Sequence, residues 1–152
     1  MNSVRRTGTF RMDQPVDLLF PLFSAEGEKL WIPGWDYENI SGSEGMHEDF
    51  FFITKAHDHS SNDQDTIWLV KKFEPENYYV QFYRVEPGQK ICLVTIRCIE
   101  VDQGTTDVEV TYEYTALSEV GRKFIAHFSE EEYKEFIGGW KTHLLHYFQS
   151  KQ

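Results

Sequence analysis

From residue 46 onward, hydrophobic and polar residues alternate with the two-residue period of β-strands. The alternating runs cover residues 46–54, 66–73, 78–85, 89–101 and 106–115. Short turn sequences such as EPEN, EPGQ and DQGT separate the later runs, and connections this short favour antiparallel hairpins. A weaker alternation at residues 7–12 predicts one earlier strand. The pattern therefore predicts a sheet of about six or seven antiparallel strands.

Helical spacing occurs on both sides of this meander. Pro15 opens a short helix, with Asp13 as its N-cap, and Pro21 shortens or kinks it. Ser24 begins a second short helix, which Pro33 and Gly34 end. From Leu117 to Tyr147 the spacing is helical again, and Ser129 with Glu132 forms a capping box.

The terminal helix carries an apolar stripe at helical spacing. The stripe consists of Tyr133, Phe136, Ile137, Trp140, Leu144, Tyr147 and Phe148. An antiparallel sheet exposes one apolar face that another element must cover. The sequence thus predicts an α+β fold in which a long C-terminal helix packs on a curved antiparallel sheet.

The turn at VDQGT predicts which residues of the last two strands share a face. A three-residue loop with Gly104 in the left-handed conformation pairs Val101 with Thr105. The same register gathers eight apolar or aromatic residues on one face: Cys92, Val94, Ile96, Cys98, Val108, Val110, Tyr112 and Tyr114. Arg97, Glu109 and Glu113 then point outward.

The turn at EPGQ extends this face to a third strand. An even-length loop there places Tyr79, Gln81 and Tyr83 beside Cys92, Val94 and Ile96. Buried hydroxyl and amide groups need hydrogen-bond partners, so this many polar tips favours a partly open cavity. The alternative is that each tyrosine reaches solvent or a carbonyl group at the edge of the sheet.

Two cysteines, Cys92 and Cys98, lie in the same predicted strand. Six residues of extended chain separate their Cα atoms by about 20 Å, whereas a disulfide requires about 7 Å or less. We therefore expect both thiols to be reduced.

The chain of 152 residues carries a formal net charge of −10, which disfavours nucleic acid and anionic membranes as partners. It has no run of apolar residues long enough for a signal peptide or a membrane span. These features predict a cytoplasmic protein. Aromatic residues make up 16% of the chain, which suits a dense core or the walls of a ligand cavity.

Three segments, FPLFSAEGEKLWIPGW, TIWLVKKFEP and DVEVTYEYTALSEVGR, resemble the SRPBCC superfamily, the START-like group of helix-grip proteins. The resemblance covers nearly the whole chain and implies one START-like domain, residues 1–152. In that group a hydrophobic tunnel lies between the sheet and the terminal helix, and two short helices close one end. Members include polyketide cyclases, plant carriers of hydrophobic ligands and activators of a heat-shock chaperone ATPase.

The leading hypothesis is a protein that binds a small hydrophobic or aromatic ligand, such as a lipid or a polyketide, without a cofactor. We expect Trp35 at the rim of the tunnel and Trp31 in the core. The expected tunnel wall is Val94, Ile96, Val110, Phe136, Trp140 and Leu144. The expected polar contacts are Tyr79, Gln81, Tyr83, Tyr112 and Tyr114.

Two other hypotheses stay open: a cyclase, dehydratase or hydrolase that uses the same tunnel, and a protein-interaction domain similar to the chaperone activators. No catalytic constellation is recognisable in the sequence, so whether the protein is an enzyme is uncertain. The clusters His57-Asp58-His59 and His47-Glu48-Asp49 are too small to predict a metal site. We expect a monomer or a weak homodimer.

Overall fold

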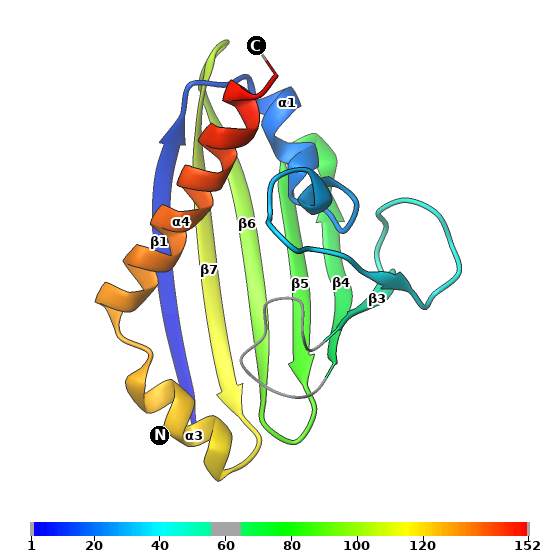
Figure 1. Cartoon of the computed structure of the whole chain (residues 1–152), viewed down its shortest axis with the longest axis vertical. Helices are drawn as coiled ribbons and strands as arrows, with labels where there is room; N and C mark the ends of the chain where they lie inside the picture. Colours follow the sequence, from blue (N-terminus) through cyan, green and yellow to red (C-terminus); the bar gives the residue numbers. More distant parts are fainter. Residues whose placement is uncertain (1, 56–64, 152) are drawn as a thin grey trace.

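The computed structural model describes residues 2–55 and 65–151, and it consists of one twisted antiparallel sheet with helices on its concave face (Figure 1). The seven strands lie in the order β1-β7-β6-β5-β4-β3-β2. The fold class predicted from the sequence, α+β with a terminal helix on a curved sheet, is confirmed. The elements are β1 (Ser3–Met12), α1 (Val16–Leu19), η1 (Phe20–Leu22), η2 (Gly27–Leu30), β2 (Glu38–Asn39), β3 (Phe51–Thr54), β4 (Thr66–Glu74), η3 (Pro75–Asn77), β5 (Tyr79–Glu86), β6 (Lys90–Asp102), β7 (Thr105–Ala116), α3 (Glu119–His127) and α4 (Glu130–Gln149).

The pairing of β6 with β7 confirms most of the predicted register. Cys92 pairs with Tyr114, Val94 with Tyr112, Ile96 with Val110 and Cys98 with Val108, and all eight side chains are buried. The prediction is wrong at the turn, where a bulge shifts the register and Asp102, rather than Val101, pairs with Thr105. Gly104 is not among the residues with positive φ. Its N–H instead donates to the Asp102 carboxylate at 2.9 Å, which closes the turn.

The predicted register of β5 is wrong, and the reason lies in the turn before β6. Glu86 pairs with Lys90, so the loop holds three residues rather than an even number. Pro87 and Gly88 form a tight turn in which Gly88 has φ +75° and Gln89 N–H donates to Glu86 O. Adjacent residues of a strand face opposite sides of the sheet, so a shift of one residue moves every side chain of the strand to the other face.

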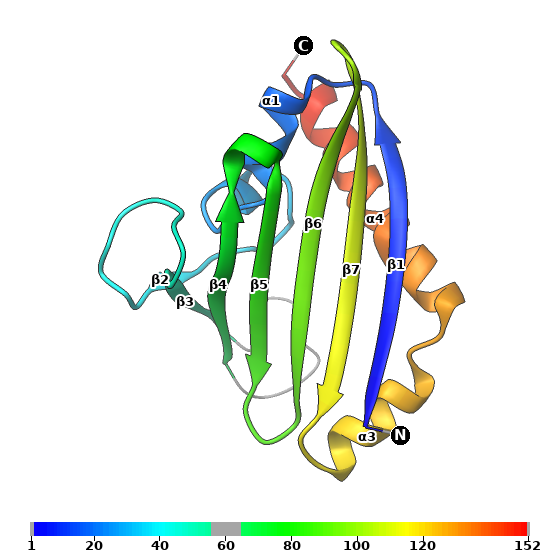
Figure 2. The ribbon, with the colours of Figure 1, turned by 180° about the vertical axis from the view of Figure 1, so that it is seen from behind.

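Tyr79, Gln81 and Tyr83 consequently lie on the outer face of the sheet and do not line a tunnel. Each has a partner there: Tyr79 lies under the Arg97 guanidinium, Gln81 donates to Thr95, and Tyr83 lies under the Lys71 ammonium. Figure 2 shows this face of the sheet, which none of the described helices covers. The alternative, in which tyrosines of the inner face reach solvent or a carbonyl group at the edge of the sheet, does not describe Tyr79 and Tyr83 either, because β5 lies between β6 and β4 and both residues are on its outer face.

The helices differ from the sequence prediction mainly in length. The helix α1 spans one turn and is followed directly by η1, which contains Pro21, and Pro15 rather than Asp13 is the N-cap residue of α1. The predicted helical region from Leu117 to Tyr147 divides into α3 and α4, because the Ser129 side chain accepts the N–H of Glu132 and begins a new helix. None of the helices described is long and apolar enough to cross a membrane.

The core lies between the concave face and α4. Tyr133, Ile137, Trp140 and Leu144 of the predicted stripe are buried, whereas Phe136 remains 43% exposed. The Tyr133 hydroxyl donates to Val110 O at 2.6 Å and joins the start of α4 to β7. Cys92 and Cys98 are free and buried, as expected, and burial raises the pKa of each thiol to about 12.

Candidate functional site

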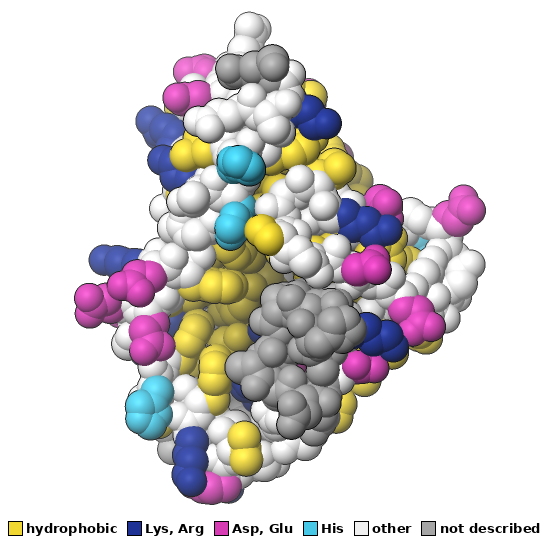
Figure 3. Space-filling model, in the orientation of Figure 1, with side chains coloured by type: hydrophobic (Ala, Val, Ile, Leu, Met, Phe, Trp, Pro, Cys, Tyr) yellow, Lys and Arg dark blue, Asp and Glu magenta, His cyan; other side chains and the backbone are white. Residues whose placement is uncertain are grey.

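A half-open cavity of about 580 Å³ lies between the concave face of the sheet, α4 and the segment around η2. The segment around η2 contributes Glu28, Trp31, Ile32, Pro33 and Trp35, the sheet contributes Trp68, Arg84 and Tyr112, and α4 contributes Glu135, Phe136, Gly139, Trp140 and His143. The side chains from the sheet are largely buried and form the floor, whereas Pro33, Glu135, Phe136 and His143 are exposed and form the rim. Figure 3 shows hydrophobic side chains gathered beside α4 on this face of the molecule.

Four tryptophans line the cavity: Trp31, Trp35, Trp68 and Trp140. Trp31 packs edge-on against Trp140 with ring centroids 5.5 Å apart, and Trp35 packs edge-on against Trp68 at 5.6 Å. Each indole of the η2 segment is fixed by a hydrogen bond, from Trp31 Nε1 to Leu22 O and from Trp35 Nε1 to Ala25 O, both at 2.8 Å. Because their N–H groups are already bonded, these two rings present apolar surface to the cavity.

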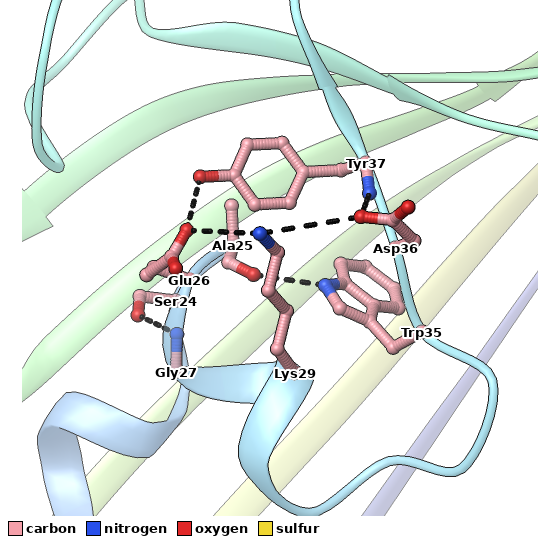
Figure 4. A network of polar contacts seen from close by, with 8 residues as sticks. All are labelled: Ser24, Ala25, Glu26, Gly27, Lys29, Trp35, Asp36 and Tyr37. Atoms are coloured by element: carbon pink, nitrogen blue, oxygen red, sulfur yellow. Dashed lines mark hydrogen bonds and ion pairs between the residues drawn. The ribbon is translucent and has the colours of Figure 1, made fainter.

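A polar network on the outer side of η2 holds this segment in place (Figure 4). The Ser24 hydroxyl accepts the N–H of Gly27, but the helix predicted to begin at Ser24 begins only at Gly27, as η2, with Glu26 as its N-cap residue. The Tyr37 hydroxyl donates to the Glu26 carboxylate at 2.7 Å, and Lys29 bridges Glu26 and Asp36. With Glu26 facing outward, Glu28 two residues later lies on the cavity side.

Close packing requires a glycine at position 27. A Cβ atom there would lie 2.3 Å from Pro21 O and 2.8 Å from the Leu22 Cα atom, both of which are backbone atoms. Real Cβ atoms essentially never approach other atoms so closely. The glycine therefore lets η2 fold back onto η1, which brings Glu28 and Trp31 over the sheet.

Glu28 is a carboxyl group buried on an apolar wall. Its residue is 7% exposed, and no hydrogen bond to its carboxyl group is found within residues 2–55 and 65–151. Desolvation raises its pKa well above the ordinary value of 4.5, because burial penalises the charged form. The shift favours the protonated form of Glu28, which can donate a hydrogen bond into the cavity.

Arg84 is the charged group on the cavity floor. Its guanidinium lies 5.5 Å from the centre of the Trp68 ring, and its Nη1 donates to the Tyr114 hydroxyl at 3.3 Å. Arg84 Nη2 lies 3.6 Å from Glu86 Oε1, and Glu86 Oε2 lies 2.8 Å from Lys90 Nζ. Tyr112 beside it is neutral, since burial raises the pKa of its phenol well above 10.0.

The pKa of Glu28 predicts an unusual dependence of stability on pH. Because the folded state holds this proton more tightly than the unfolded chain, its contribution is most favourable below the unfolded pKa and is lost as the pH rises toward the folded pKa. Glu28→Gln removes that loss, so we expect a higher urea midpoint than wild type at pH 8 and a difference that shrinks toward pH 4.

Glu26→Gln is the matched control, two residues earlier in the same turn. The hydrogen bond from Tyr37 lowers the pKa of Glu26, so this carboxylate stabilises the fold above its unfolded pKa and the effect is lost as the pH falls. The variant should therefore be less stable than wild type at pH 8 and equal to it in acid. Equal responses of both variants to pH would contradict the burial of Glu28.

The predicted site residues divide into three groups. Trp35, Tyr112, Phe136 and Trp140 do line the cavity, and Trp31, expected only in the core, lines it as well. Val94, Ile96, Val110, Tyr114 and Leu144 are buried as expected but belong to the core below the cavity, outside its lining. Tyr79, Gln81 and Tyr83 lie on the outer face.

Glu28, Trp68 and Arg84 are lining residues that sequence reasoning missed. Arg84 occupies alternate positions with Val80 and Phe82, both buried, so the same alternation with the correct loop length would have placed it inside. Nothing in the sequence distinguishes Glu28 from the exposed Glu26. The outward positions expected for Arg97, Glu109 and Glu113 are confirmed by their pairing in β6 and β7.

The described residues contain no group of three or more potential metal ligands. His47 is engaged locally, with Nε2 at 2.6 Å from the Ser43 hydroxyl and Nδ1 at 2.7 Å from Glu48 O. The cluster His57-Asp58-His59 lies outside the described residues.

No family model and no curated protein matches the chain. Solved structures do match. A norcoclaurine synthase mutant from Thalictrum flavum, solved with a transition-state analogue, is 10% identical with a TM-score of 0.71 and covers 99% of this chain and 97% of its own. A Streptomyces aromatase/cyclase, Zhui, is 12% identical with a TM-score of 0.59 and covers 98% and 88%.

The protein Ara h 8.0201 is 11% identical with a TM-score of 0.63, and the match covers 92% of this chain and 91% of that one. All three neighbours combine a curved antiparallel sheet with a C-terminal helix, the arrangement seen here. Identities this low show a shared fold rather than a shared activity. The chain has the helix-grip fold of the SRPBCC, or Bet v1-like, proteins.

Proposed function

We propose that the protein binds a small hydrophobic or aromatic ligand in the cavity between the sheet, η2 and α4. The observation that carries this proposal is the cavity of about 580 Å³ with four tryptophans in its wall. Sites for small molecules commonly measure about 300–1,000 Å³ and combine apolar walls with a few polar groups. Here Arg84, Glu28 and Tyr112 are the polar groups.

Two of the structural neighbours support the same proposal by their printed descriptions. One norcoclaurine synthase structure contains dopamine and hydroxybenzaldehyde, which are small aromatic molecules, and another neighbour is an aromatase/cyclase.

A neutral hydrophobic dye, Nile red, tests the proposal. We expect saturable binding of the dye, with enhanced dye fluorescence and quenching of the cavity tryptophans. Gly139→Leu should weaken binding about 5- to 150-fold, because the side chain would enter a cavity that Gly139 lines and overpacking costs about 1–3 kcal/mol.

Gly138→Leu is the matched control, because Gly138 precedes Gly139 in α4 but does not line the cavity. A Cβ atom at either position would meet nothing within 4 Å, so both variants should fold. Both also remove a glycine from the interior of a helix, which favours the helix by up to about 1 kcal/mol each. Binding that is absent in wild type, or equally weakened in both variants, would refute ligand binding in this cavity.

The ionisable side chains on the wall favour one second candidate, an enzyme of the cyclase, dehydratase or hydrolase class. A protonated Glu28 is suited to act as a general acid, and a guanidinium is suited to stabilise a developing oxyanion. Glu28→Gln separates the two candidates. Turnover of a bound aromatic ketone that disappears in this variant while binding persists would support the enzyme.

A further inference from the structure

Arg84 belongs to a buried cluster in which the positive charges outnumber the negative ones. The Glu86 and Lys90 side chains are 4% and 6% exposed, and Arg84 is 17% exposed where it meets the cavity. The one carboxylate lies closer to Lys90, at 2.8 Å, than to Arg84, at 3.6 Å. The three side chains together therefore carry one net positive charge beside the cavity.

The hydrogen-bonding capacity of Arg84 is also incompletely used. A guanidinium has five N–H donors, and the structure gives it one hydrogen bond, to the Tyr114 hydroxyl. Its Nε is buried and has no hydrogen-bond partner in the described part of the chain. A buried donor without a partner is destabilising, so the site is incomplete as it stands.

No anionic side chain of the described residues takes up the unused donors of Arg84. Glu28 lines the same cavity, but the ion pair found for Arg84 among the described residues is with Glu86 and not with Glu28, and desolvation disfavours the charged form of the Glu28 carboxyl group by raising its pKa. Glu135 lies on the exposed rim, on α4. The remaining lining residues are aromatic, aliphatic or glycine, apart from His143 on the rim.

We infer that the ligand carries one carboxylate group, which binds the Arg84 guanidinium while the apolar part of the ligand packs among the tryptophans. This inference rests on the proposed ligand binding and names the chemical class of the ligand. A single negative charge balances the cluster, whereas a phosphate dianion would leave an excess negative charge in an apolar site. The planar guanidinium also matches the geometry of a carboxylate.

A matched set of naphthalene probes tests the inference by isothermal titration calorimetry at pH 7. The set consists of 2-naphthoate, the uncharged 2-naphthamide and 2-naphthyl phosphate. For wild type we expect 2-naphthoate to bind about 10- to 100-fold more tightly than the amide, the range that a charge-assisted hydrogen bond of about 1.5–3 kcal/mol supplies. The phosphate should bind less tightly than the carboxylate.

Arg84→Met should abolish the preference for 2-naphthoate over 2-naphthamide. This variant leaves Glu86 and Lys90 as a balanced pair, so it should fold, and circular dichroism checks that it does. Arg84→Lys, which keeps the charge, should restore part of the preference. Arg97→Met is the matched control, because Arg97 lies on the outer face of the sheet, and it should bind all three probes as wild type does.

The outcomes separate this inference from the proposed function. If wild type binds the amide and Nile red but shows no preference for 2-naphthoate, the carboxylate inference is wrong and ligand binding stands. Tighter binding of the phosphate would also overturn it. If wild type binds neither Nile red nor any naphthalene probe, both the proposed function and the inference fail. A preference for 2-naphthoate that is lost in Arg84→Met and kept in Arg97→Met supports both the proposed function and the inference.

Discussion

Glu86→Gln is expected to lower the free energy of unfolding by about 3–5 kcal/mol, the largest loss among the variants considered. Glu86 is 3% exposed, and its carboxylate lies between the Arg84 guanidinium and the Lys90 ammonium. The amide that replaces it has no charge, so two cations would remain buried without a counter-ion. Urea unfolding at pH 7, followed by circular dichroism, measures the loss.

Glu119→Gln is the control for this variant. Glu119 pairs with Arg122 on the surface of α3, and the two side chains are 68% and 44% exposed. Ion pairs of this kind contribute up to about 1 kcal/mol and often nothing measurable. A loss in Glu86→Gln no larger than that in Glu119→Gln would show that the cluster around Arg84 is not buried as described.

A second variant connects this cluster to the ligand site. If the loss in Glu86→Gln arises from two unbalanced cations, adding Arg84→Met should recover part of it, because one cation then remains. A double-mutant cycle measures the recovery as a coupling energy between the two residues. The same substitution at Arg84 should remove the preference for carboxylate ligands. The positive charge of Arg84, which destabilises the Glu86→Gln variant, would thus also be the charge that selects the ligand.

The order of the elements followed from the sequence because its signals are local. Each of these signals depends on residues close by in the sequence. Examples are the alternation at residues 106–115, the capping residue Ser129 and the stripe through Tyr133 and Leu144. The face shared by β6 and β7 also followed, since a bulge at Val101 shifts the pairing only beside the turn. Local patterning was sufficient to predict a helix packed on a sheet.

The presence of Arg84 in the site could not be predicted because it depended on one residue in one loop. The count of residues between Glu86 and Lys90 decides whether β5 presents Tyr83 or Arg84 to the inside, and the wrong count exchanges the two faces. A charged residue inside is also the choice that hydrophobic patterning rejects. Burial of Arg84 becomes understandable once Glu86, Tyr114 and Trp68 are seen around it.

The side chains of η2 that face the cavity could not be predicted from the sequence for a different reason. A short 3-10 turn has no repeating pattern that would assign Glu26 outward and Glu28 inward. The Tyr37 hydroxyl, eleven residues after Glu26, fixes the orientation of this turn through a tertiary contact. The resemblance of FPLFSAEGEKLWIPGW to helix-grip proteins indicated that the segment closes the tunnel, without indicating which side chains face it.

Leu144→Ala is expected to lower the free energy of unfolding by about 2–5 kcal/mol, the usual cost of truncating a fully buried leucine. Leu144 is 0% exposed, in the part of α4 that packs on the core, whereas Leu145 beside it is 41% exposed. Leu145→Ala, the same chemical change one residue later, should therefore cost far less. Equal losses would mean that α4 does not pack on the sheet through the face described.

Leu144→Ala also tests whether Leu144 lines the binding site, as the sequence predicts, or belongs to the core, as in the structure. As part of a tunnel wall, Leu144 would contact the ligand, and its truncation would change the affinity for Nile red directly. In the structure it lies one turn beyond Trp140, in the core and outside the cavity lining. We therefore expect Leu144→Ala to reduce stability strongly while the affinity of the folded protein for Nile red stays within about threefold of wild type, a change of less than 1 kcal/mol. A loss of affinity as large as that of Gly139→Leu would extend the binding site along α4 to Leu144.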